Sequence, residues 1–187
     1  MIRKRKSIRL TGYDYSRPGA YFVTICVKDH TNLFGSIEKA VMRENEFGKI
    51  VRECWNDLPN HYSSVKLDTF VIMPNHIHGI IVILDDDHVD VVAGLKPATT
   101  PAPTNKIKRH GLSEIIRALK TFSARRINEI RESSGVPIWQ RNYYEHIVRT
   151  ESALHQIRKY IEENPVNWQV NNGEILSDEL KRITALV

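Results

Sequence analysis

The chain of 187 residues is 41% hydrophobic, which is enough for one globular domain with a sizeable core. It contains 27 lysines and arginines and 22 acidic residues, so its net charge is +5. This positive charge favours a polyanion over an acidic protein surface as the binding partner. The two cysteines lie far apart and outside any CxxC motif, which argues against a disulfide framework or a cysteine metal site and indicates a cytoplasmic protein.

The first predicted strand follows a basic arm over residues 1–12. No apolar segment of the kind found in signal peptides follows the arm, and no part of the chain has an apolar run of membrane-spanning length. Residues 20–27, AYFVTICV, are aromatic and β-branched and predict a strand. In residues 44–57 apolar side chains recur at three- and four-residue spacing, which predicts an amphipathic helix that ends near Pro59.

A pair of neighbouring antiparallel strands is predicted next, over about 65–72 and 77–84. Pro74 and Asn75 separate them, and because proline cannot donate into a sheet ladder, this break predicts a turn. The segment that follows, residues 85–111, carries acids, prolines and small polar residues and predicts a long flexible loop.

Two helices and one further strand complete the predicted elements. Ser113 is expected to cap the first helix, whose apolar side chains follow a period of 3.6 and are Ile115, Ile116, Leu119, Phe122, Ile127 and Ile130. Residues 138–148 are aromatic-rich and predict either a strand or an irregular approach to one. A last helix is predicted over 150–164, ended by Pro165.

The predicted order of elements, β-α-β-β-α-β-α, is close to the split βαβ pattern of ferredoxin-like and RRM-like domains. We therefore expect an α+β fold with an antiparallel sheet and with helices on one face of it. One domain over residues 1–187 is expected to account for the chain, with the basic arm, the loop and a C-terminal tail (169–187) attached to it.

The segment MPNHIHG, residues 73–79, places two histidines in an otherwise apolar run. On a strand, positions i and i+2 project from the same face with Cα atoms about 6.5 to 7 Å apart, so His76 and His78 are expected to converge where two imidazole nitrogens can share a metal ion. The alternative is two half-buried histidines that bond to backbone or water. Two histidines are too few for a structural zinc site, so a further ligand must come from elsewhere.

The last predicted helix carries a second candidate group. Tyr160 and Asn164 are four residues apart, so they present a phenol and an amide on one helix face. The alternative is a tyrosine at the rim of the core and an asparagine that only ends the helix. Tyr143 and Tyr144 compete with Tyr160 as candidate nucleophiles, and since they are adjacent in a predicted strand, one of them is expected to pack in the core.

Several segments together resemble the REP-associated tyrosine transposases, which are relatives of the single-tyrosine HUH transposases. They are the segments NHIHG, WQRNYYEHIVR and YIEENPVNW, the basic middle helix, and the opening IRLTGYDYSRPGAYFVTICV. The resemblance runs from about residue 8 to residue 168. Asn164 stands where the insertion-sequence branch of the superfamily has a metal-binding glutamine, as is common in the REP branch.

The resemblance implies a divalent metal ion, Mg²⁺ or Mn²⁺, held by His76, His78 and Asn164. It also implies that Tyr160 attacks a phosphodiester in single-stranded DNA and leaves a 5′-phosphotyrosine link and a free 3′-OH. The implied partners are single-stranded DNA and DNA hairpins formed by repetitive extragenic palindromes, with no membrane, and the chain acts as a monomer or a homodimer. Because these ligands carry no formal charge, we expect a DNA phosphate to complete the metal site.

Basic side chains are expected to neutralise the DNA backbone, so that binding weakens steeply with salt. Lys120 is expected to lie nearest the scissile phosphate. The whole predicted set comprises five residues of the arm and three of the middle helix, namely Arg3, Lys4, Arg5, Lys6, Arg9, Arg117, Lys120 and Arg125.

Two other functions stay open from the sequence. One is an RRM-like sheet that binds single-stranded nucleic acid through aromatic stacking on Tyr21 and Phe22 and does not cut it. The other is a metal-dependent phosphodiesterase in which water is the nucleophile.

Overall fold

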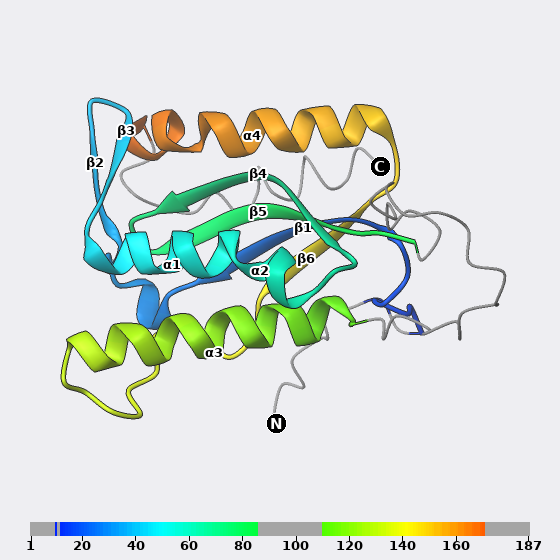
Figure 1. Ribbon diagram of the computed structural model, residues 1–187. Helices are drawn as coiled ribbons and strands as arrows, with labels where there is room; N and C mark the ends of the chain where they lie inside the picture. Colours follow the sequence, from blue (N-terminus) through cyan, green and yellow to red (C-terminus); the bar gives the residue numbers. More distant parts are fainter. Residues whose placement is uncertain (1–9, 11, 86–109, 171–187) are drawn as a thin grey trace, which may run out of the picture.

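A four-stranded antiparallel sheet forms the centre of the molecule in the computed structural model, which describes residues 10, 12–85 and 110–170 (Figure 1). Its spatial order is β4-β5-β1-β6, and every neighbouring pair is antiparallel. The strands are β1 (Gly19–Cys26), β4 (Val65–Met73), β5 (His76–Ile83) and β6 (Tyr144–Val148). The predicted α+β fold and the turn at Pro74 and Asn75 are confirmed.

Helices cover both faces of this sheet, so the expectation of helices on one face is wrong for the last of them. Helices α1 (Glu46–Asn56), α2 (Leu58–His61) and α3 (Leu112–Ile130) lie on one face, and α4 (Glu151–Val170) lies on the other (Figure 1). The physical reason is that the central strands are apolar on both sides, so each side needs a cover.

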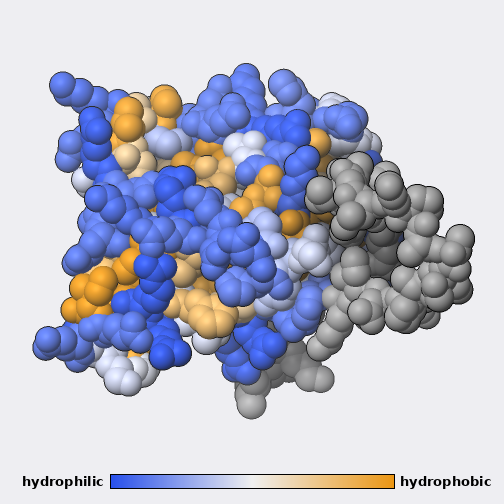
Figure 2. All heavy atoms as spheres, in the orientation of Figure 1, coloured by the Kyte–Doolittle hydropathy of each residue, from blue (hydrophilic) through white to orange (hydrophobic). Residues whose placement is uncertain are grey.

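The side chains of β5 alternate between two hydrophobic clusters. Ile77, Ile81 and Ile83 join the larger cluster under α1 and α3, whereas Ile80 packs with Phe22 and Ile157 in a smaller cluster under α4. His76 and His78 follow the parity of Ile80 and therefore face α4. Hydrophilic residues cover most of the face seen in Figure 2, with hydrophobic residues in smaller patches between them.

The glycine of the NHIHG segment is needed for packing on the other face of the sheet. A Cβ atom at Gly79 would lie 2.5 Å from the ring of Trp55, which is buried and stacks on Phe70 with ring centroids 4.3 Å apart. A side chain at this position would displace α1, because Trp55 belongs to that helix. Gly79 therefore lets β5 support the core immediately next to the histidines.

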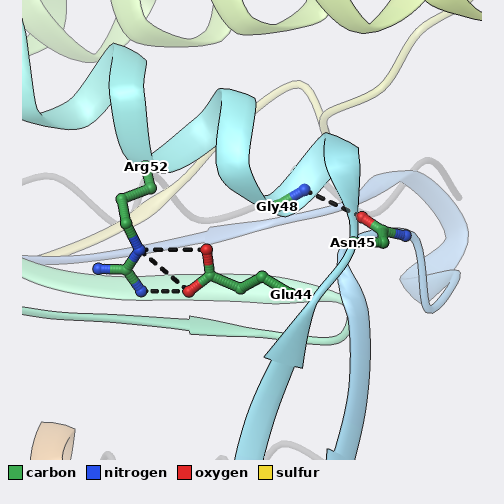
Figure 3. A network of polar contacts seen from close by, with 4 residues as sticks. All are labelled: Glu44, Asn45, Gly48 and Arg52. Atoms are coloured by element: carbon green, nitrogen blue, oxygen red, sulfur yellow. Dashed lines mark hydrogen bonds and ion pairs between the residues drawn. The ribbon is translucent and has the colours of Figure 1, made fainter.

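A hairpin that the sequence analysis missed stands at one end of the sheet. It consists of β2 (Gly35–Glu38) and β3 (Val41–Glu44), and its turn residues Lys39 and Ala40 have positive φ angles. The side chain of Asn45 then caps α1 by accepting from two backbone N–H groups, at 3.0 Å each. Arg52 forms an ion pair with Glu44, which ties α1 to the hairpin (Figure 3).

The details of α3 differ from the prediction at both ends. Gly111, not Ser113, occupies the N-cap position, because the buried Leu112 already belongs to the helix and donates its N–H to the carbonyl of Tyr15. Of the predicted apolar stripe, Phe122 and Ile130 are 54% and 50% exposed. The buried face of α3 runs instead through Leu119, Ser123 and Ile127.

Helix α4 continues through Pro165 to Val170, so the predicted end at Asn164 is wrong. Proline removes one backbone hydrogen bond, but the added turn places the Trp168 ring 5.6 Å from the ring of His76, and this contact favours the longer helix. Among the described residues, no helix is long and apolar enough to cross a membrane. The expected flexible loop and most of the basic arm and C-terminal tail lie outside the described residues.

A bidentate ion pair fixes α4 to the edge of the sheet. Arg158 donates to the two carboxylate oxygens of Asp68 over 2.8 and 2.6 Å, at the point where the register of β4 against β5 shifts. Asp68 also accepts from the backbone N–H of Thr69. The hydrogen bond from Arg158 lowers the pKa of Asp68 from 3.8 to about 2.

Asp68→Asn is expected to lower the free energy of unfolding by about 1 kcal/mol at neutral pH, because the pair is partly exposed. A carboxyl group whose pKa is depressed by folding stabilises the protein above its unfolded pKa, so the contribution is lost as the pH falls from about 4 to about 2. Urea unfolding of both proteins over this range checks the prediction, with Glu163→Gln, at an exposed ion pair of the same helix, as the control. A difference between the wild type and Asp68→Asn that persists undiminished at pH 2 would contradict it.

Candidate functional site

The two histidines of the NHIHG segment face each other under α4. The Nε2 atoms of His76 and His78 are 3.0 Å apart, and both side chains are buried. The i, i+2 spacing on β5 produces this arrangement, because both rings leave the sheet on the same side.

Asn75 fixes which nitrogen of His76 carries the proton. Its amide nitrogen donates to the backbone carbonyl of His30 over 3.2 Å, so its amide oxygen is the atom that faces His76 Nδ1 at 2.7 Å. An oxygen acceptor requires a proton on Nδ1, and the Nε2 of His76 is then an unprotonated lone pair aimed at His78. This is the arrangement that a metal-binding histidine has in proteins.

Thr24 holds the second histidine in the same way. Its hydroxyl lies 2.8 Å from Nδ1 of His78, on the neighbouring strand and directly opposite in register. A hydroxyl can accept from a protonated Nδ1 or donate to an unprotonated one. It can therefore leave the Nε2 of His78 as either a donor to His76 or a second lone pair.

Burial keeps both rings neutral. It lowers the pKa of His76 to about 3, with a smaller effect from the charge of His30, and it lowers the pKa of His78 well below its usual value. Neutral imidazoles are the form that binds metal ions. Two nitrogens bonded at about 2.1 Å to one ion at a right angle stand about 3.0 Å apart, so the pair fits a shared divalent cation.

Tyr160 reaches the histidines from α4. Its hydroxyl lies 3.4 Å from Nε2 of His78, and the two rings meet edge to face with centroids 5.2 Å apart. Asn164, one turn further along α4, is buried on the same side as Tyr160. A phenol, two imidazoles and an amide thus gather between α4 and the sheet.

Aromatic rings surround this group, and Trp168 is the one that the sequence analysis missed. Its ring lies beside His76, and Phe22 lies beside both His78 and Tyr160, with centroids 5.6 and 6.2 Å away. Trp168 ends the YIEENPVNW segment, four residues after Asn164, but the predicted helix end concealed that both residues lie on one helix face. Asn75 and Thr24 were also missed, since neither shows its role without the folded sheet.

The competing tyrosines point to opposite faces of the sheet, where Tyr144 begins β6 and Tyr143 directly precedes it. Tyr144 packs against Phe22 on the side of the histidines, with ring centroids 6.4 Å apart. Tyr143 packs against the larger core on the other side, and its hydroxyl lies 3.4 Å from Ser113 Oγ. Of these three tyrosines, Tyr160 has both its hydroxyl and its ring in contact with His78.

The structure separates the predicted DNA-binding residues from the histidines. Arg117, Lys120 and Arg125 belong to α3, on the opposite face of the sheet from α4. The ammonium group of Lys120 donates to the backbone carbonyls of Gln140, Arg141 and Asn142 and so holds that segment against α3. The prediction that Lys120 lies nearest the phosphate attacked by Tyr160 is therefore wrong, because the two residues lie on opposite faces of the sheet. Arg3, Lys4, Arg5, Lys6 and Arg9 lie outside the described residues.

Comparisons with known proteins point to one family. The model of IS200-like transposases matches residues 82–164. Two proteins of Haemophilus influenzae are similar. An uncharacterized protein is 41% identical over 90% of this chain and 92% of its own length. A "Putative REP-associated tyrosine transposase" is 28% identical over 82% of this chain and 73% of its own length. A solved structure of a REP-associated tyrosine transposase bound to a REP hairpin shares the fold, with a TM-score of 0.52 and 16% identity over 85% of this chain and 73% of that one.

Proposed function

Since the chain belongs to the REP-associated tyrosine transposases, within the IS200-like transposases, we propose that it cuts and rejoins single-stranded DNA through a covalent bond to Tyr160. The observation that carries the proposal is the position of the Tyr160 hydroxyl, 3.4 Å from a histidine nitrogen that faces a second one at 3.0 Å. A phenol that served only the core would not need its hydroxyl beside one of two facing, neutral imidazoles.

His76, His78 and Asn164 are the residues that would hold a divalent cation, Mg²⁺ or Mn²⁺. Such an ion supplies charge stabilisation on the oxygens of the phosphate under attack. The three protein ligands carry no formal charge, so binding of the cation and of the DNA phosphate is expected to be mutually dependent. Asn75 and Thr24 orient the two imidazoles toward the shared position.

In the proposed step, the Tyr160 oxygen forms a bond to the phosphorus and the bond from phosphorus to the 3′ oxygen of the preceding nucleotide breaks. The phenol gives up its proton and the departing 3′ oxygen takes one up, so the products are a 5′-phosphotyrosine and a free 3′-OH. One phosphoester replaces another. Another 3′-OH can therefore attack the link and rejoin the strand without ATP.

The direct test is a denaturing gel of the full chain after incubation with labelled hairpin DNA, taken from repeats near its own gene, and Mn²⁺ or Mg²⁺. We expect a protein band that carries the label and that disappears after EDTA is present from the start. Mass spectrometry of the digested band is expected to find the nucleotide on the peptide that contains Tyr160. Cleaved DNA without any labelled protein would overturn the proposal in favour of attack by water.

The RRM-like binding module gains no support from the fold. Such modules stack bases on aromatic side chains at an open sheet face. Here Phe22 lies under α4 and Tyr21 lies in the core on the other side, and both are fully buried. A base cannot reach either ring while the helices are in place.

A further inference from the structure

Helix α3 lies between two grooves of opposite electrostatic character. The first groove lies toward α1 and α2 and includes three acidic residues, Glu53, Asp57 and Glu114. The second, of about 450 Å³, lies between α3 and residues 137–143. We name the second one the cationic groove and define it by six of its lining residues, Ser113, Arg117, Lys120, Thr121, Gln140 and Arg141.

No acidic side chain lines the cationic groove in the described part of the chain, whereas three basic ones do. Its other polar groups are hydroxyls and amides, which can donate hydrogen bonds. A concave surface of one sign of charge concentrates ions of the opposite sign. The chemistry of the lining therefore fits an anion.

The two arginines of the groove have their guanidinium groups available. Both Arg117 and Arg141 are exposed, and no ion pair with an acidic residue forms at either one among the described residues. Other arginines of α3 differ, since Arg125 pairs with Glu129 and Arg126 pairs with Glu53. The ammonium group of Lys120 already donates to three backbone carbonyls, so it adds positive charge to the groove without a free N–H donor.

We propose that the cationic groove binds the phosphodiester backbone of the DNA substrate at a second position, away from the reacting phosphate, through Arg117 and Arg141. The inference rests on the proposed function for the identity of the polyanion. Because α3 and α4 cover opposite faces of the sheet, the groove would bind a different part of the DNA from the part at Tyr160 (Figure 1). Fork-shaped guanidinium groups suit phosphate oxygens particularly well.

The test compares three forms of the full chain: wild type, Arg117→Gln/Arg141→Gln, and a control, Lys49→Gln/Arg126→Gln. The control also loses two positive charges, from exposed positions outside the cationic groove. Fluorescence anisotropy with a labelled hairpin, measured from low to high salt, gives the slope of log Kd against log salt concentration. Two separate probes, a blunt hairpin stem and an unstructured oligonucleotide of equal charge, distinguish paired from single-stranded DNA in the groove.

The Arg117→Gln/Arg141→Gln protein is expected to lose two phosphate contacts. The magnitude of its slope is then expected to be smaller than that of the wild type by about 1.8 for paired DNA or about 1.4 for a single strand. The control is expected to keep the wild-type slope. Equal slopes in all three proteins, or equal losses in both variants, would overturn the proposal. The labelled adduct at saturating DNA is expected to persist in the groove variant. A missing adduct in the wild type would instead refute the role of Tyr160 while the salt slopes still test the groove.

Discussion

Tyr160→Phe is expected to abolish the covalent DNA adduct and to leave hairpin binding within a few-fold of the wild type. The change removes one oxygen atom, so the ring keeps its contacts with Phe22 and with His78. Loss of a nucleophile reduces turnover by on the order of 10⁴-fold or more in enzymes with covalent intermediates. The measurements are the labelled protein band and, in parallel, anisotropy with the same hairpin.

Tyr144→Phe is the matched control, because this tyrosine also packs against Phe22 on the site face of the sheet. It is expected to retain the adduct. If Tyr160→Phe still formed the adduct and Tyr144→Phe did not, the nucleophile would be Tyr144. Cleavage without an adduct in both variants would assign the attack to water.

Replacement of either histidine is expected to abolish metal binding at the site along with its activity. His76→Ala and His78→Ala each delete one nitrogen of the facing pair, and the remaining imidazole and amide are too few ligands for a weakly held divalent ion. Electron paramagnetic resonance of Mn²⁺, titrated into the Tyr160→Phe protein with its hairpin, measures the affinity without cleavage. We expect no saturable Mn²⁺ binding in either alanine variant.

Asn75→Leu provides a graded comparison in the same titration. It leaves both histidines present but removes the oxygen that holds the proton on Nδ1 of His76, so Mn²⁺ affinity is expected to fall by roughly 10- to 100-fold. Circular dichroism of each variant verifies the fold. Unchanged Mn²⁺ binding in His76→Ala would show that the ion is held elsewhere.

The sequence predicted the parts of the site that depend on short periodicities. A spacing of two on a strand brings His76 and His78 together, and a spacing of four on a helix aligns Tyr160 with Asn164. The turn after β4 was predictable because proline and asparagine mark it. Each of these patterns needs only one element and its local geometry.

The missed features depend on contacts between distant segments. Nothing local to Asn75 indicates that His30, 45 residues away, orients its amide. The turn of the β2–β3 hairpin consists of Lys39 and Ala40, which lack the glycine or asparagine that positive φ angles usually select. Helix α4 passes Pro165 because Trp168 gains a packing partner in His76, and such tertiary gains are invisible to helix propensity.

Strand β5 separates the larger hydrophobic core from the side of the sheet that carries the candidate site. Its odd-numbered isoleucines build the larger core, and its histidines lie on the other side with the smaller cluster. Mutations that accumulate by drift at Tyr160 or His76 therefore spare the larger core and the groove along α3. On the proposed function, a gene copy inactivated in this way is expected to encode a folded protein that competes with the intact one for DNA.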